Sequence, residues 1–82
     1  MSFELFHQIV DPGSARVRKF VTDHELTQVV KFRNVAFDGP MAKLKSIGGD
    51  GAVPALWDGE NLVVGADAVM ARLLAFGDVG RE

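Results

Sequence analysis

Apolar and polar residues alternate along the chain with two periods, one typical of strands and one typical of helices. Residues 3–9 carry Phe or Leu on both alternating faces, as in a strand that is covered on both sides. Over residues 14–26 the apolar positions fall at helical spacing, with Val17 and Val21 on one stripe. Residues 27–35 are rich in β-branched side chains and alternate again, which predicts a second strand.

The second half of the chain is predicted to contain shorter elements. Glycine and proline mark their ends, because these residues fit poorly inside helices and strands. The tetrapeptide Asp58-Gly59-Glu60-Asn61 is typical of a hairpin turn between two short strands. The predicted elements are a helix over residues 41–47, strands over 52–57 and 62–64, a helix over 67–76, and a polar tail over 77–82 that is expected to fray.

Taken in order, these elements predict a single α/β domain over residues 1–82 with the order β-α-β-α-β-β-α. The helix between the first two strands implies a right-handed crossover and a parallel pair. The tight turn after Trp57 implies an antiparallel pair. A mixed four-stranded sheet with helices on both faces is the packing that buries the apolar stripes of these elements.

The first helix begins at residues that favour both capping and ligand binding. Asp11 is a favoured N-cap residue, and Pro12 suits the first helical position because its missing N–H would be unpaired there. A helix N-terminus can hold an anion or a thiolate, although the Asp11 carboxylate can fill that position itself. Asp11 is therefore either a helix cap or a ligand-facing or catalytic residue. Ser14 lies in the first turn, where it is either a structural hydroxyl or a candidate nucleophile.

Composition excludes several kinds of chemistry. The chain has no cysteine, which excludes disulfides, thiolate metal sites and thiol redox cycles carried by this chain. Two separated histidines do not indicate a metal cluster, and a net charge of −2 gives no overall attraction for nucleic acid or anionic membranes. Without a long apolar run or a basic-then-apolar leader, we expect a soluble, cytoplasmic protein.

Three segments together resemble a thioredoxin-fold protein of the glutaredoxin type, or the N-terminal domain of a glutathione transferase. Asp11-Pro12-Gly13-Ser14 stands where glutaredoxins have Cys-Pro-x-Cys. Val53-Pro54-Ala55-Leu56 is similar to the family segment whose proline is cis, and Val64-Gly65-Ala66-Asp67 leads into the last helix as in the family. The resemblance therefore implies a thioredoxin-like fold, a cis Val53–Pro54 bond and a glutathione site.

The same resemblance assigns possible ligand contacts to individual residues. It implies that Val53 offers its backbone to a peptide-like ligand beside Pro54, and that Gly65 and Ala66 donate backbone N–H groups to a carboxylate. Asp67 is then placed to bind the ligand's amine, or to cap the last helix, or both.

Two departures from the family pattern bear on catalysis. Asp11 replaces the attacking cysteine and Ser14 the second one, so glutaredoxin-type reduction is excluded. An ionised Asp11 would also repel a bound thiolate, and Gly65-Ala66 replaces the Glu-Ser or Gln-Ser pair of the transferases.

These features leave three functional hypotheses. The first is a redox-inactive glutaredoxin-like module that binds glutathione or a protein segment along the Val53–Pro54 edge. The second is a small transferase-like enzyme that uses Ser14 or the first-turn amides to stabilise the glutathione thiolate. The third is a structural module in which exposed apolar residues mediate dimerisation, so that the protein is a homodimer and not a monomer.

Overall fold

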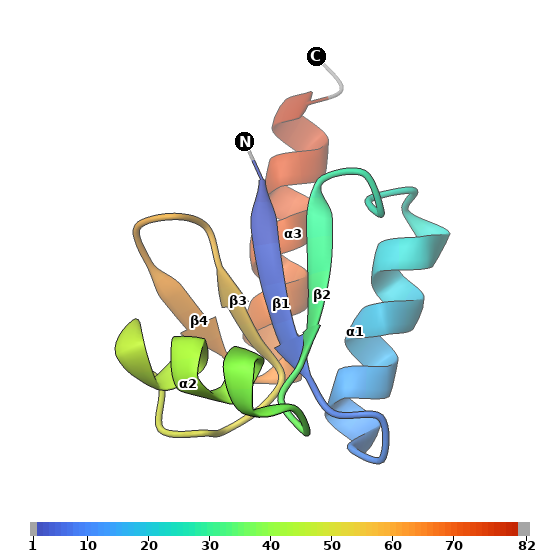
Figure 1. Cartoon of the computed structure of the whole chain (residues 1–82). Coiled ribbons are helices and arrows are strands. Elements are labelled where there is room, and N and C mark those ends of the chain that lie inside the picture. Colours follow the sequence, from blue (N-terminus) through green and yellow to red (C-terminus); the bar gives the residue numbers. More distant parts are fainter. Residues whose placement is uncertain (1, 81–82) are drawn as a thin grey trace.

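The computed structural model describes residues 2–80, with side chains up to residue 76, and has the predicted element order. It is an α/β structure with three helices and a mixed four-stranded sheet in the order β2-β1-β3-β4 (Figure 1). The elements are β1 (Phe3–His7), α1 (Pro12–Asp23), β2 (Val30–Asn34), α2 (Asp38–Ser46), β3 (Ala55–Trp57), β4 (Leu62–Val64) and α3 (Ala66–Gly80).

Strand pairing follows the two connections that the sequence predicts. β1 and β2 are parallel, with Phe3 opposite Val30, because α1 carries the chain back between them. β3 is antiparallel to both β1 and β4, and the β3–β4 turn is closed by a hydrogen bond from the Asp58 N–H to the Asn61 carbonyl at 3.2 Å. The arrangement is compatible with the expected thioredoxin-like fold.

Two apolar layers cover the sheet, with α1 and α3 on one face and α2 on the other (Figure 1). Alternation along β1 explains both layers, since Leu5 packs with the α1 and α3 residues whereas Phe6 packs with α2. Val17 and Val21 are fully buried, as their predicted stripe requires. The α2 layer is smaller, and its buried members are Phe6, Val35, Leu44 and Ala55.

Several element ends differ from the sequence-based predictions. The first strand stops at His7, and α1 ends at Asp23 because the chain turns at Glu25, whose φ of 56° is not helical. β2 starts at Val30 because the N–H groups of residues 29 and 30 both bond to the Leu26 carbonyl in a turn. These changes shorten the elements without changing their order.

The remaining differences involve proline and glycine. α2 starts at Asp38, since Pro40 is tolerated in a first helical turn. β3 starts only after Pro54, which has no N–H to donate to a neighbouring strand. α3 continues to Gly80, past its predicted end and into residues expected to fray, because each residue added to an existing helix gains a hydrogen bond. Residues 81–82 lie outside the described residues.

Candidate functional site

Asp11 caps α1, as one of its two predicted roles requires. Its backbone is extended, with φ −83° and ψ 121°, and its Oδ2 accepts a hydrogen bond from the Ser14 N–H at 2.7 Å. Pro12 occupies the first helical position, where it leaves no additional N–H unpaired. One carboxylate oxygen of Asp11 is therefore already engaged by the helix that it starts.

Ser14 is completely buried and has a structural partner. Its Oγ accepts a hydrogen bond from the Gln8 N–H at 3.2 Å, and the side chain has no exposed surface. The hydroxyl thus joins the first turn of α1 to the segment that leaves β1. A ligand thiolate has no access to this oxygen in the described conformation.

Gly13 marks the point where three predicted segments meet. A Cβ at this position would lie 3.2 Å from Pro54 Cδ, 3.4 Å from Asp11 Oδ2 and 3.6 Å from Ala66 Cβ. The small residue therefore allows the first turn of α1 to approach both the Val53–Pro54 loop and the start of α3. We call this meeting point the Pro54 junction; it comprises residues 11–14, Val53, Pro54 and residues 65–67.

Pro54 and Gly65 tie the other two parts of the Pro54 junction together. The Val53–Pro54 bond is cis, as the family resemblance implies, and Pro54 is buried. The Gly65 N–H donates to the Pro54 carbonyl at 2.9 Å, and Gly65 has a φ of 104°, which favours glycine. The loop is thereby held against the N-terminal end of α3.

Some backbone groups at the Pro54 junction have no protein partner. Among the described residues, the N–H and C=O groups of Val53 form no hydrogen bond, and neither do the N–H groups of Ala66 and Asp67. The residue before α3 is Gly65, which has no side chain to cap the helix, whereas Asp11 caps α1. These are hydrogen-bonding groups that a peptide or a carboxylate can use.

Asp67 lies on the surface of the Pro54 junction and pairs with Arg16 of α1. The distance from Arg16 Nη2 to Asp67 Oδ1 is 3.0 Å, and the two side chains are 61% and 90% exposed. An ion pair this exposed contributes little to stability. Both charges therefore remain accessible to a ligand that carries an amine and a carboxylate.

His7 and Arg18 form a polar contact that the sequence pattern did not reveal. Arg18 Nη1 lies 3.1 Å from His7 Nδ1 and 3.2 Å from the Gln8 carbonyl, while Nη2 lies 3.3 Å from the Ile9 carbonyl. Because a guanidinium only donates, His7 Nδ1 must accept and hence be unprotonated. Burial, and then the charge of Arg18, lower the pKa of His7.

Each of the three basic residues of α1 contacts a different partner. Lys19 pairs with Asp23 at 2.7 Å, on the next turn of the same helix. Since Arg16 pairs with Asp67 and Arg18 contacts His7, each of these three basic side chains has a partner of its own. The pair of Arg16 with Asp67 could not be predicted from the sequence, because the two residues are 51 positions apart.

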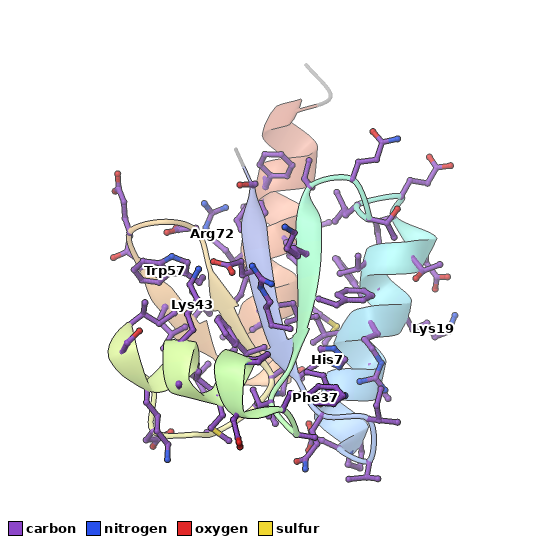
Figure 2. The ribbon with its side chains drawn as sticks, in the orientation of Figure 1. His7, Lys19, Phe37, Lys43, Trp57 and Arg72 are labelled. Atoms are coloured by element: carbon purple, nitrogen blue, oxygen red, sulfur yellow. The ribbon has the colours of Figure 1, made fainter. Side chains whose placement is uncertain are left out.

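Large apolar side chains are exposed at the end of the sheet that bears the Pro54 junction. Ile9 and Val10, in the segment before α1, are 61% and 82% exposed, and Phe37 at the start of α2 is 66% exposed. Figure 2 shows Phe37 at the same end of the sheet as His7. We call Ile9, Val10 and Phe37 the apolar rim.

The Pro54 junction offers backbone donors and acceptors together with one exposed ion pair. No group of three or more metal-ligating side chains occurs in the part of the chain that the structure describes, and the chain has no thiol. A pocket lies elsewhere, near the start of β1. Within residues 2–80 no helix is long and apolar enough to cross a membrane.

Comparisons with models of known protein families, with curated proteins and with solved structures found no match. The chain is therefore not assigned to a family.

Proposed function

We propose that this protein is a redox-inactive domain of thioredoxin-like, glutaredoxin-type fold that binds glutathione or a related peptide segment at the Pro54 junction. The observation that carries the proposal is that no hydrogen bond within residues 2–80 engages the Val53 backbone, which lies next to a helix that begins directly after Gly65, a residue with no side chain to cap it. The sheet order and the close approach of Gly13 to Pro54 support the same proposal.

The ligand backbone would add to the edge that Val53 offers. A peptide placed there exchanges hydrogen bonds with both backbone groups of Val53, as an added strand does. Its carboxylate accepts from the N–H groups of Ala66 and Asp67, where the helix dipole also favours negative charge. An amine on the same end of the ligand pairs with the exposed Asp67 carboxylate.

Binding without catalysis fits the remaining side chains. At about 4 Å, two like charges near a protein surface repel by roughly 4 kcal/mol, so the Asp11 carboxylate opposes a ligand thiolate beside it. The Ser14 hydroxyl is buried and already accepts the Gln8 N–H. Neither residue is thus arranged to stabilise a thiolate, and the proposal assigns them to the scaffold of the site.

A two-dimensional amide NMR titration tests the proposal directly. Reduced glutathione is expected to cause saturable shifts at residues 11–16, Val53 and residues 65–67. S-methylglutathione, which has no ionisable thiol, is expected to bind at least as tightly because Asp11 no longer faces a thiolate. The absence of saturable shifts with either ligand up to about 10 mM would contradict the proposal.

A matched pair of variants separates the site from general charge effects. Asp67→Asn is expected to weaken glutathione binding by roughly twofold to fivefold, the range of an exposed ion pair. Asp23→Asn is the control, because Asp23 is also an exposed aspartate with a cationic partner, but lies at the far end of α1. Equal affinities for both variants would remove Asp67 from the site.

The apolar rim favours a second candidate function, which is self-association. Val10 is the most exposed of its three members. Sedimentation of the native protein and of Val10→Asp tests for self-association. A dimer that this substitution dissociates would support an interaction module. A monomer at about 0.5 mM would dispose of this candidate without affecting the glutathione titration.

A further inference from the structure

A pocket of about 530 Å³ lies at the opposite end of the sheet from the Pro54 junction. Its lining includes Phe3, Glu4, Lys31, Arg33, Lys43 and Trp57. It exists because α2 has nine residues, about 14 Å of helix, and covers only the half of the sheet face near Phe6. We call this hollow the Trp57 pocket.

Strand register places the charged side chains of the Trp57 pocket on one face. Glu4 is paired with Lys31 across the parallel strands and with Trp57 across the antiparallel ones, and Phe6, which faces α2, is paired with Arg33. Alternation along β1 and β2 thus directs Glu4, Lys31 and Arg33 to the α2 side. Figure 2 shows Lys43, from α2, near Trp57.

Glu4 holds two of the three cations in position. Its Oε1 lies 2.9 Å from Arg33 Nε and its Oε2 lies 2.6 Å from Lys43 Nζ, and its side chain is only 17% exposed. Burial alone would raise the pKa of Glu4, but hydrogen bonds and charge from Lys43 and Arg33 lower it below its ordinary value. The carboxylate is therefore ionised and anchors both partners.

Positive charge nevertheless exceeds negative charge in the Trp57 pocket. Lys31, Arg33 and Lys43 line it together with the single carboxylate of Glu4, which leaves an excess of two positive charges. Among the described residues, the side chain of Lys31 has no hydrogen-bond or ion-pair partner. A cluster that served only to attach α2 to the sheet would need Glu4, Arg33 and Lys43, but not Lys31.

We infer that the Trp57 pocket binds a small oxyanion, such as a phosphate or carboxylate, that is attached to an aromatic ring. Lys31 and the free donors of Arg33 bind the oxyanion, since a guanidinium paired through Nε keeps further N–H groups available. The half-buried indole of Trp57 supplies an apolar surface for the ring. The volume lies within the usual range for small-ligand sites.

Phenyl phosphate is the probe, and Trp57 is the reporter because it is the one tryptophan of the chain. In an amide NMR titration of the whole chain, phenyl phosphate is expected to shift the Trp57 indole signal and the amides of residues 27–31 in a saturable way. Inorganic phosphate and phenol, each of which lacks one part of the ligand, are expected to bind more weakly. The Pro54 junction amides should not move.

Lys31→Gln is the decisive variant, and Lys45→Gln is its control. Both lysines are exposed, but Lys45 lies on α2 outside the lining of the pocket. Lys31→Gln is expected to weaken phenyl phosphate binding about fivefold, and Lys45→Gln to leave it unchanged. The inference is overturned by the absence of saturable shifts up to about 10 mM, or by equal weakening in the two variants.

Discussion

Replacing Asp11 by alanine tests whether this residue belongs to the scaffold or to a catalytic site. The change removes the acceptor of the 2.7 Å hydrogen bond from the Ser14 N–H and leaves the start of α1 without a side-chain cap. Loss of a helix N-cap costs about 1 kcal/mol, within a range of about 0.5–2. Because α1 contributes the buried Val17 and Val21 to the core, this cost is expected in the global free energy of unfolding.

The expected size can be refined with a second substitution. Asp11→Asn keeps an oxygen acceptor and loses only the attraction between the charge and the helix dipole, about 0.3–1 kcal/mol. For a domain of this size, each kcal/mol corresponds to about 6 °C in Tm. Asp11→Ala should therefore be the less stable of the two variants, by a difference that thermal unfolding can resolve.

Urea unfolding followed by the fluorescence of Trp57 measures these changes, with an unchanged m-value as the sign of two-state behaviour. Asp23→Ala, in the last turn of the same helix, is the control, since it removes only an exposed pair with Lys19 and should change stability by less than about 0.5 kcal/mol. If Asp11→Ala were as stable as the native protein or more stable, the capping argument would be refuted. Increased stability would instead identify Asp11 as a residue kept for function.

Three further predictions concern pH and packing. His7 and Glu4 both have lowered pKa values in the folded state. The contribution of each group to the free energy of unfolding is therefore fully present above its ordinary pKa, 6.5 for His7 and 4.5 for Glu4, and is lost as the pH falls below that value. Urea unfolding at a series of pH values should show the free energy of unfolding of the native protein falling below about pH 6.5, and His7→Asn should not show this decrease. A free energy of unfolding that stays constant between about pH 7.5 and 5 would contradict the assignment. Leu44→Ala, at a fully buried position, should lower the free energy of unfolding by about 2–5 kcal/mol in calorimetry. Leu74→Ala, at a half-exposed position, is the control and should lower it by less than about 0.5 kcal/mol. Similar losses in the two variants would show that α2 is not packed as described. Gly13→Val should cost about 1–3 kcal/mol through crowding at Pro54, and equal stability would argue against the close approach there.

The order of elements and the start of α1 were predictable because they depend on local interactions. Alternation and helical spacing come from the few residues within each element, and Asp11 caps an N–H only three residues away. The hairpin at residues 58–61 is equally local, and the absence of cysteine excluded thiol chemistry directly. The predicted ends of the helices and strands were less accurate, because a single turn, such as the one at Glu25, can end a helix while its apolar periodicity continues.

The arrangement of side chains from distant segments was decided only by the tertiary structure. Ser14 could be assigned to the scaffold only once Gln8 was seen to bond to it in a buried position. The pair of Arg16 with Asp67 and the Trp57 pocket join residues far apart in sequence. The packing of α1 against α3 brings the pair together, and strand register brings together the pocket residues. Periodicity assigns a residue to a face of one element, whereas its neighbours on other elements depend on how those elements pack.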